Sequence, residues 1–387
     1  MTFNFPVAGK SYEQRGNLRT YRVSSFGWIR NALANNRFRT ELGRNVVTAL
    51  NYVVVNLRIF LKLSALIRRH SIDIVSIHDW LTSISGILCR LVFRKKVVFH
   101  IHSTEISMNH WSHNQDVFSR TIALLEKTMA RFASSVIVPS EEFRLLLAKH
   151  RFQQQKITAI HHGFDDDGIG QIRALSPPEI KTRVGQIRGK LNLDESHKVI
   201  VYAGRYSHHK GILSLVDAME LVTRVIPEVK LLLIGTVLDL THQKREILKK
   251  ISECEQKGSI VPYRTFIPSN ELYLHFLMAD LCVFPSIFEP FGLVAVEAMA
   301  LERPVILGKG FSRSIAYVSS QEGQKSPADR RTALQLKSER PAELAEKIVY
   351  LLHEPDKGRE MARRAKEHVS SQFSWTKAAA ETLQCYA

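Results

Sequence analysis

Apolar and polar positions along the first half of the chain follow two alternating patterns. Short continuous apolar runs, typical of buried strands, are separated by longer stretches in which apolar residues recur every three or four positions, as on one face of a helix. They predict strands at residues 18–23, 72–77, 96–101 and 135–139, and helices at 45–67, 81–91, 118–132 and 141–150. Strands and helices that alternate in this way form a parallel sheet, which binds ligands at the carboxyl ends of its strands.

The second half repeats the pattern after a polar interruption. Residues 166–197 are mostly polar and contain Pro177-Pro178, which predicts a linker with a short helix. The patterns that follow predict strands at residues 198–203, 229–234, 260–266, 279–285 and 304–307, and helices at 212–225, 246–255, 270–278, 341–352 and 356–369. The fold class is therefore α/β, with two Rossmann-like doubly wound domains at residues 1–165 and 198–370.

The most apolar stretch of the sequence, residues 45–67, has the length of a membrane span. Polar residues interrupt it at Asn45, Asn51, Asn56, Arg58 and Lys62. We therefore interpret it as an amphipathic helix that covers a sheet. Arg68 and Arg69 follow directly, so a helix lying in a membrane interface stays open as the alternative.

Composition indicates an ordinary globular protein with an uneven charge. The 387 residues are 45% hydrophobic and 24% charged, and the length suits two domains with separate cores. The net charge is +17, and residues 1–70 hold twelve Lys or Arg against two carboxylates, a net +10. Three interpretations compete for this segment: a solvated basic face, a peripheral contact with an anionic membrane, or binding of nucleic acid. We expect no specific nucleic acid, because no recognition motif accompanies the charge.

The cysteines and the start of the chain favour a cytoplasmic setting. Cys89, Cys254, Cys282 and Cys385 are scattered, without the spacing of a metal site or a redox motif. Such cysteines are typical of reduced thiols. We expect no signal peptide, since the first residues lack a basic leader. The protein is expected to be cytoplasmic, with the inner face of the membrane as its possible place of contact.

Chemistry is concentrated in Ser286-Ile-Phe-Glu-Pro-Phe-Gly-Leu-Val-Ala-Val-Glu-Ala-Met-Ala300. This stretch predicts a loop that contains Glu289, followed by a helix that contains Glu297. The first amides of such a helix, at Phe291, Gly292 and Leu293, suit a diphosphate, and the carboxylates suit hydroxyl groups on either side of it. A buried strand–loop–helix, with one solvated Glu and one favoured by the helix dipole, is the plain alternative.

A second group of residues supplies cations. Gly204-Arg205 ends a predicted strand, and Lys210-Gly211 opens the next helix. Two cations about five residues apart neutralise a diphosphate, and the guanidinium adds bidentate hydrogen bonds. Taken alone, a surface Arg and a surface Lys fit the pattern equally well. The carboxylate stretch downstream favours the functional interpretation.

These two stretches resemble the E-x7-E and GR-x4-KG signatures of the retaining glycosyltransferases of family 4, glycosyl transferases group 1. That superfamily, with members like glycogen, starch and sucrose synthases, has the GT-B fold, in which two domains face a central cleft. The resemblance implies that Glu289 contacts the donor sugar, Glu297 the ribose, and the amides of Phe291 to Leu293 the diphosphate. It implies that Arg205 and Lys210 stabilise the leaving diphosphate.

The resemblance places further roles by position. Arg264 and Phe266 lie where family members contact the base. His102, in His-Ile-His-Ser-Thr-Glu, corresponds to a histidine that faces the donor sugar, against the alternative of a chance histidine at a strand end. His78-Asp79-Trp80 resembles an acceptor-side pattern. The alternation of His100 and His102 leaves open which of them faces the site.

The segment Thr158-Ala-Ile-His-His-Gly-Phe-Asp165 resembles a family strand that ends in Asn-Gly-x-Asp, with His162 in place of Asn. In the GT-B fold the closing residues, here 371–387, cross back onto the first domain. Two departures from the family stand out. No strong strand and Gly-rich loop precede Leu18, and Gly308-Lys-Gly replaces a Gly-Gly loop.

The resemblance implies a hexosyltransferase that moves a sugar from a nucleotide-diphosphate sugar to a hydroxyl on a glycan or lipid-linked acceptor. It implies retention at the anomeric carbon, without a protein nucleophile, a metal or a cofactor. Asp165-Asp-Asp167 is expected to be a capping or solvated run. Because of the two departures, a catalytically impaired protein that binds nucleotide sugar stays the alternative. A phosphorylase or an epimerase on the same fold is disfavoured, since no cofactor lysine is evident and an epimerase should lack the Arg205–Glu289 combination.

Overall fold

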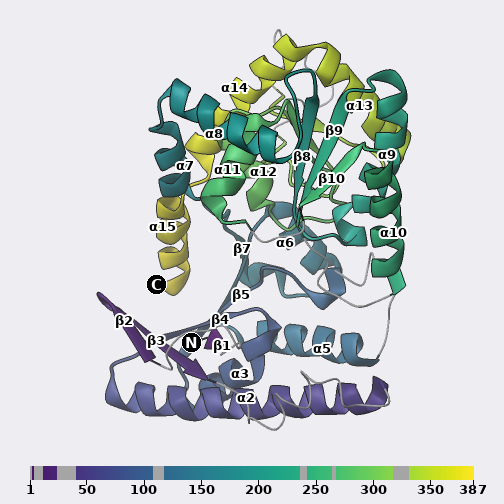
Figure 1. The fold of residues 1–387 in the computed structure, drawn as a ribbon. Helices are drawn as coiled ribbons and strands as arrows, with labels where there is room; N and C mark the ends of the chain where they lie inside the picture. The colour runs from purple at the N-terminus through teal and green to yellow at the C-terminus, as the bar shows by residue number, and fades with distance from the viewer. Residues whose placement is uncertain are drawn as a thin grey trace, which may run out of the picture. The chain divides into compact units, whose positions relative to one another are not determined.

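The structure is a computed structural model that forms two compact units (Figure 1). The structure describes residues 2–3, 12–23, 41–107, 117–235, 242–263, 267–316 and 331–387. Unit 1 consists of residues 1–138, 143–159 and 382–387, and unit 2 of residues 139–142 and 160–381. Both are α/β units built on parallel sheets, so the predicted fold class is confirmed. The predicted domain limits at residues 165 and 198 stay a prediction beside this division.

Unit 1 is built on a four-stranded parallel sheet in the order β4-β5-β6-β7. Its strands are β4 (Ile74–His78), β5 (Lys96–His100), β6 (Ser135–Val138) and β7 (Ile157–Ala159). Its helices are α2 (Glu41–Arg69), α3 (Ser83–Phe93), α5 (Val117–Phe132) and α6 (Glu141–Lys149), with short 3₁₀ turns η1 (Trp80–Thr82) and η2 (Gln154–Lys156). Val97, Val98 and Phe99 of β5 are fully buried, as expected for a strand covered on both faces.

The first residues form a small sheet of their own. β2 (Tyr12–Arg15) and β3 (Leu18–Val23) make an antiparallel hairpin, and β1 (Thr2–Phe3) pairs with β3 in parallel. Gly16 takes the left-handed backbone that the tight turn needs. The predicted strand at residues 18–23 therefore exists, but it belongs to this sheet and not to the parallel one. In the part of unit 1 that the structure describes, the parallel sheet begins at β4, and Gly9 lies outside the described residues.

The long helix α2 lies along the outer side of unit 1, beyond α3 (Figure 1). It packs mainly on α3, with smaller contacts to η1 and β3. Asn56 is fully buried in that contact, where its amide donates to the carbonyl of Leu81 at 3.0 Å and its Oδ1 accepts from the N–H and hydroxyl of Ser85. By length and composition, residues Val46–Arg69 are apolar enough to cross a membrane. Only 17% of the most apolar stretch of this helix is buried inside the protein.

The last residues of the chain belong to unit 1. Lys96 donates to the carbonyl of Tyr386 at 3.1 Å, and Ser135 donates to the carbonyl of Cys385 at 3.4 Å. The Tyr386 hydroxyl lies 3.4 Å from Nε2 of His100. These contacts attach the end of α15 (Trp375–Tyr386) to the two central strands of the sheet, β5 and β6.

Unit 2 is built on a six-stranded parallel sheet in the order β10-β9-β8-β11-β12-β13. Its strands are β8 (Lys198–Ala203), β9 (Val229–Ile234), β10 (Ile260–Tyr263), β11 (Leu281–Phe284), β12 (Val305–Leu307) and β13 (Leu334–Gln335). Its helices are α7 (Asp166–Arg173), α8 (Pro177–Lys190), α9 (Ile212–Val225), α10 (His242–Gln256), α11 (Ser269–Met278), α12 (Leu293–Ala300), α13 (Pro341–His353), α14 (Pro355–Gln372) and the first part of α15, with the 3₁₀ turn η3 (His208–Lys210). Two large apolar clusters fill the faces of this sheet.

Residues 166–197, which we expected to be a linker with one short helix, form two helices that pack on unit 2. Asp165 caps α7 by accepting from the N–H of Gly168 at 3.0 Å, as expected for a capping run. Ser176 and Glu179 form a reciprocal capping box that starts α8. Ile169 and Ile172 of α7 are buried in the core of the unit.

Candidate active site

Two loops at the carboxyl ends of β8 and β11 are held together by backbone contacts. Gly211 takes a left-handed backbone with φ of +70°, and a Cβ there would lie 2.1 Å from the carbonyl oxygen of Pro285. The N–H of Ile287 donates to the carbonyl of His209 at 2.8 Å. A side chain at residue 211 would force the loops apart. The glycine therefore lets the loop that carries Arg205 and Lys210 contact the loop that carries Glu289.

This contact brings Lys210 and Glu289 together across 79 positions of sequence. Nζ of Lys210 lies 2.6 Å from Oε2 of Glu289, and the two side chains are only 16% and 13% exposed. Ser286 donates a second hydrogen bond to the same carboxylate oxygen at 3.1 Å. Two charges removed this far from water need each other, because either one left alone would bear a large desolvation cost. A ligand that replaces this pairing must therefore offer both an anion and a hydrogen-bond donor.

Arg205 adds a second cation at the same sheet edge. It directly follows Gly204, and its side chain is exposed. Its carbonyl accepts from the hydroxyl of Tyr202 at 2.7 Å, which fixes the turn after β8. Burial, followed by the charges of Lys210 and Arg205, lowers the pKa of His209 to about 3. The imidazole is therefore neutral at neutral pH, and the positive charge here belongs to Arg205 and Lys210.

The helix α12 begins directly after Gly292, a glycine in the left-handed backbone conformation. Gly292 caps the helix with φ of +98°, and a Cβ on it would lie 2.3 Å from the ring of Phe311 and 3.0 Å from Cγ of Glu289. Phe291 is buried, and its ring packs against those of His161 and Phe373. The aromatic anchor and the glycine together fix the start of the helix, where free amides and the dipole favour an anion.

The Gly308-Lys-Gly stretch packs against the carboxylate loop through its backbone. The N–H of Gly308 donates to the carbonyl of Phe284 at 2.8 Å, and that of Gly310 to the carbonyl of Ser286 at 3.1 Å. A Cβ at Gly308 would lie 2.1 Å from the carbonyl oxygen of Ser286, and one at Gly310 would meet Ile287 at 2.4 Å. Both glycines are therefore required for close packing. Lys309 lies between them, so the two glycines are not adjacent as in a Gly-Gly loop.

Glu297 lies on α12 in a small buried cluster. The hydroxyl of Tyr273, a fully buried residue of α11, is 3.3 Å from Oε1 of Glu297 and 3.0 Å from Oδ2 of Asp165. Burial raises the pKa of Glu297 to about 7, and the nearby charge of Asp165 adds to the rise, while the hydrogen bond from Tyr273 lowers it. Because one hydroxyl proton serves two carboxylates, the state of Glu297 is sensitive to what else binds there.

Unit 1 presents a stack of three imidazoles at the carboxyl ends of β4 and β5. The ring of His78 lies 4.4 Å from that of His100 and 5.3 Å from that of His102, all nearly parallel. Nδ1 of His78 and Nε2 of His102 are 3.0 Å apart, so these two rings share a hydrogen bond. His100 and His102 thus both contact His78, and which of them faces a donor sugar stays a prediction. Burial, together with His102, lowers the pKa of His78.

Asp79 and Trp80 have clear structural contacts. Asp79 has a left-handed backbone with φ of 52°, and its Oδ1 accepts from the N–H of His102 at 2.8 Å. It thereby holds the loop that carries His102. The carbonyl of Trp80 accepts from the hydroxyl of Tyr52 at 2.7 Å, and the two rings lie 5.1 Å apart. A role for these residues toward an acceptor stays a prediction.

A buried carboxyl supports the loop after β5. Glu126 of α5 is 1% exposed, and its two oxygens accept from the N–H of Glu105 at 3.0 and 3.2 Å. Burial raises the pKa of Glu126 to about 8, against the lowering effect of that hydrogen bond. Glu105 in turn accepts from Ser119 at 2.8 Å. The carboxyl therefore acts on the His102 loop as a support and does not face solvent.

The predicted residues of unit 2 thus gather at one sheet edge, whereas those of unit 1 gather at another. Arg264 and Phe266 lie outside the described residues. Sequence reasoning missed Tyr273 and Ser286, which contact the predicted carboxylates, and treated Asp165 only as a cap. The family-like pattern that ends at Asp165 was the one signal for that residue. Within the described ranges, no three His, Cys, Asp or Glu side chains form a group suited to a metal ion.

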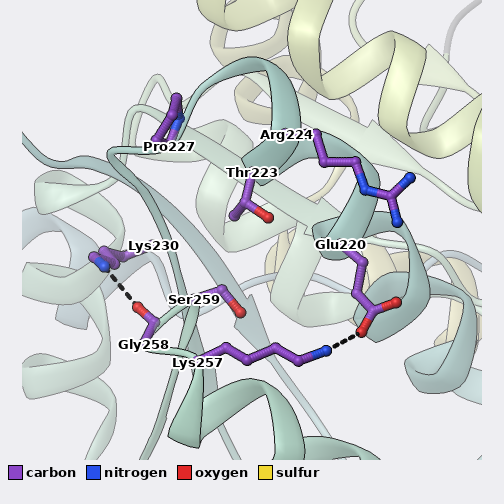
Figure 2. A pocket seen from close by; sticks show the side chains of 8 residues that line it. All are labelled: Glu220, Thr223, Arg224, Pro227, Lys230, Lys257, Gly258 and Ser259. Atoms are coloured by element: carbon purple, nitrogen blue, oxygen red, sulfur yellow. Dashed lines mark hydrogen bonds and ion pairs between the residues drawn. The ribbon is translucent and has the colours of Figure 1, made fainter.

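A depression of about 300 Å³ lies elsewhere on unit 2 (Figure 2). It is lined by Glu220, Thr223, Arg224, Pro227, Lys230, Lys257, Gly258 and Ser259. Figure 2 shows two of its cations already engaged, Lys257 with Glu220 at 2.7 Å and Lys230 with the carbonyl of Gly258 at 2.6 Å. These residues surround the amino ends of β9 and β10, opposite the edge where parallel sheets bind ligands. The depression is therefore separate from the candidate site.

The protein has the architecture of a GT-B glycosyltransferase, with two α/β units that are each built on a parallel sheet and with the two signature motifs after β8 and β11. Two known protein families match the chain and agree with this architecture. The model of glycosyl transferases group 1 matches residues 184–368, and that of glycosyltransferase family 4 matches residues 26–167. Together they match most of the chain, which belongs to the family 4, group 1 glycosyltransferases. The prediction from the two signatures is confirmed.

Curated relatives are glycosyltransferases. The alpha-maltose-1-phosphate synthase of Mycolicibacterium smegmatis is 25% identical over 325 residues, covering 81% of this chain and 78% of that protein. The glycogen synthase of Mycobacterium tuberculosis is 26% identical over 322 residues, covering 81% of this chain and 68% of that protein. The protein is accordingly a nucleotide-sugar-dependent glycosyltransferase of the hexosyltransferase type.

Solved structures share the fold at low sequence identity. The sucrose-phosphate synthase of Thermosynechococcus elongatus superposes with a TM-score of 0.75 at 22% identity, covering 98% of this chain and 86% of that one. The Anabaena protein HepE, in complex with UDP and glucose, gives a TM-score of 0.68 at 20% identity, covering 94% of this chain and 85% of that one. These likenesses establish the GT-B fold.

Proposed function

We propose that the protein transfers a hexose from a nucleoside diphosphate sugar to a hydroxyl acceptor with retention at the anomeric carbon. The observation that carries this proposal is the ion pair of Lys210 and Glu289 beside the amino terminus of α12. The pair offers a cation for phosphate and a carboxylate for sugar hydroxyls within 2.6 Å of each other.

Binding of the donor would replace the ion pair of Lys210 and Glu289 by two interactions with the donor, one for each side chain. The Lys210 ammonium would turn to the diphosphate, together with Arg205 and the amides of Phe291, Gly292 and Leu293. Glu289 would then accept from hydroxyls of the sugar, and Glu297 from the ribose. The exchange keeps every buried charge paired, which lowers its cost. Arg264 and Phe266 are proposed to contact the base.

Catalysis would come from positioning and electrostatics. The bond between the anomeric carbon and the diphosphate oxygen breaks, and the acceptor oxygen forms the new bond on the same face. The acceptor proton passes to the leaving diphosphate, so no protein nucleophile is needed. Lys210, Arg205 and the helix terminus stabilise the charge that develops on the departing phosphate. His102 is proposed to face the sugar from unit 1.

The donor base and the acceptor are open to experiment. We propose UDP-glucose as the first donor to test, because HepE was solved with UDP and with UDP-glucose. The acceptor is proposed to be a hydroxyl on a glycan or a lipid-linked saccharide, with His78, Asp79 and Trp80 on its side of the site. We propose that no cofactor or metal takes part. The setting is proposed to be cytoplasmic, at the inner face of an anionic membrane attracted by basic residues 1–70.

The test compares a site variant with a matched ion pair elsewhere in unit 2. Lys210→Met should abolish release of sugar from the donor and weaken nucleotide-sugar binding at least tenfold. Lys250→Met removes the ammonium of α10 that pairs with Asp217 of α9 at 2.7 Å, and neither residue belongs to the site loops. That variant should retain both activities. Equal activity of Lys210→Met and Lys250→Met would contradict the proposal.

The catalytically impaired alternative has its own outcome. A protein that binds UDP-glucose in a thermal-shift titration, but releases no glucose with or without acceptors, would be a nucleotide-sugar-binding relic. A ligand at 100 times its dissociation constant stabilises by about 2.7 kcal/mol, which such a titration detects. A panel of uridine, adenosine and guanosine diphosphates in the same assay would identify the base.

A further inference from the structure

A row of apolar side chains on α2 faces away from unit 1. Val46, Leu50, Val53, Leu57 and Leu61 follow one another at spacings of three or four residues, so they share one face of the helix. Their exposed fractions lie between 41% and 66%. The row extends over about 22 Å at the helical rise per residue. We call these five residues the outer row.

The opposite face of α2 is fixed to the unit. Val55 and Ile59 are 2% and 3% exposed, and the buried Asn56 amide joins the helix to α3 through Leu81 and Ser85. A helix whose inner face carries this polar network cannot cross a bilayer without breaking it. The exposure of the outer row is therefore a property of the folded unit.

Cations lie beside the outer row on the same helix. Arg58, Lys62 and Arg69 are spaced four and seven residues apart, which places them along one flank of the row. All three are exposed, and Nζ of Lys62 lies 4.6 Å from the ring centroid of Tyr21 in β3. From residue 42 to the end of α2 the sequence contains no Asp or Glu. The surface is thus apolar in the middle and basic at its side.

We propose that the outer row lies in the plane of an anionic membrane surface, with the basic flank toward lipid headgroups. This goes beyond a simple charge attraction of residues 1–70, because it assigns insertion to five named side chains. An apolar helix face buried at the headgroup boundary and flanked by cations is the usual form of an interfacial helix. It deepens the proposed membrane setting and is independent of the transfer reaction.

Charge decides between a bilayer and other occupants of this face. A second copy of the chain would bring another net +10 from residues 1–70 toward the first, which opposes association through this surface. A nucleic acid would satisfy the cations but would leave the five apolar side chains of the outer row in water. An anionic bilayer satisfies both parts of the surface.

The experiment measures binding of the full chain to lipid vesicles by sedimentation. We expect binding to vesicles of phosphatidylcholine mixed with phosphatidylglycerol, and little binding to phosphatidylcholine alone. The double variant Leu57→Ser/Leu61→Ser should weaken binding by about tenfold or more, because two apolar side chains no longer enter the bilayer. Lys62→Gln/Arg69→Gln should weaken it roughly fivefold per cation at low salt.

The matched control removes two exposed apolar side chains from unit 2. Val225 and Leu248 are 57% and 42% exposed, so Val225→Ser/Leu248→Ser should bind vesicles like the parent. Absence of vesicle binding, or equal binding of the outer-row variant and the control, would overturn the proposal. A parent chain that dimerises in light scattering, and becomes monomeric only in the outer-row variant, would assign the face to a second copy instead.

The two proposals fail in different ways. Donor hydrolysis is assayed in solution, and outer-row variants should retain it because they leave the site untouched. A chain that binds vesicles but transfers no sugar would refute the proposed reaction alone. A chain that transfers sugar but ignores vesicles would refute the membrane surface alone.

Discussion

The hydroxyl of Tyr273 lies 3.3 Å from Oε1 of Glu297, and this contact joins α11 to the helix of the donor site. Burial holds the pKa of Glu297 near 7, above the ordinary value of 4.5, and the hydrogen bond from Tyr273 limits the rise. The carboxyl is therefore protonated in part of the population at neutral pH. Its proposed contact with ribose makes nucleotide-sugar binding dependent on this state.

We predict that binding of UDP-glucose tightens by about tenfold between pH 6 and pH 8, as the competent carboxylate becomes the main form. A nucleotide sugar is the right ligand, because its diphosphate lacks the terminal phosphate that titrates near pH 6. Tyr273→Phe should move the midpoint to higher pH, since the lowering hydrogen bond is lost. Titration calorimetry across this range measures both effects.

Tyr350→Phe is the matched control, because Tyr350 is 43% exposed and far from the carboxylates in sequence. It should leave the pH profile unchanged. A flat profile for the parent protein would rule out Glu297 as the titrating group at the ribose. An unchanged midpoint in Tyr273→Phe would show that the hydroxyl does not act on that carboxyl.

We predict that Glu126→Gln stabilises the protein at pH 8 and above. The folded-state pKa of Glu126, about 8, lies above the ordinary 4.5, so the carboxyl favours folding fully below pH 4.5, and that contribution is lost as pH rises toward 8. Above pH 8 the native state holds a buried charge at a cost of several kcal/mol. The amide avoids this cost and still accepts from Glu105.

Thermal unfolding of the parent and of Glu126→Gln at pH 5 and pH 8.5 measures this difference. The variant should gain several degrees at the higher pH and little at the lower. Glu246→Gln, on α10, removes an exposed carboxylate of unit 2 and should show no such pH-dependent gain. The same gain at both pH values would indicate a packing effect without titration.

We predict that Gly292→Ala costs roughly 1–3 kcal/mol and abolishes nucleotide-sugar binding. The residue holds φ of +98°, and the new Cβ would lie 2.3 Å from the Phe311 ring, so the start of α12 must shift. Gly185→Ala, in α8, has open space around its Cβ and should be neutral or slightly stabilising. Chemical denaturation gives both free energies of unfolding. Wild-type binding by Gly292→Ala would remove the helix terminus from the donor site.

We predict that Asn56→Ala destabilises unit 1 by roughly 3 kcal/mol, because the N–H of Ser85 and the carbonyl of Leu81 lose their partner, while the Ser85 hydroxyl keeps the backbone carbonyl of residue 56. The neighbouring Asn51 offers a sharp comparison, since its Oδ1 is buried without a hydrogen bond. Asn51→Ala should therefore cost much less. Hydrogen exchange in α2 should rise in the first variant alone. Equal costs would assign the effect of residue 56 to packing.

The sequence predicted most of the fold because buried parallel strands are continuous apolar runs, such as Val229–Ile234, that turn signals bound clearly. It predicted only one short helix where α7 and α8 lie, because their composition is polar and only Ile169 and Ile172 are buried in the core. β13 was missed because two residues carry no period. Short helices with two buried positions and short edge strands are defined by tertiary contacts that a local pattern does not contain.

The candidate site shows the same division. The two sequence motifs predicted Arg205, Lys210, Glu289 and Glu297 as site residues, because the spacing of each pair suits a diphosphate or the hydroxyls beside it. Tyr273 carries no such spacing, and only the packing of α11 on α7 and α12 brings it to Glu297. The stack of His78 and His102 likewise depends on strand register, since His78 lies opposite His100 in the pairing of β4 with β5. Register becomes visible only in the folded sheet.

The attachment of Tyr386 to β5 has a consequence for how the protein is made. Residues 382–387 are synthesised after residues 160–381 of unit 2, yet they complete a unit whose other parts precede residue 160. During translation the aromatic ring that contacts His100 is absent until residue 386 has been added, so unit 1 matures only after unit 2 has been synthesised. A change at residues 382–387 would therefore act on the part of the protein that is synthesised first.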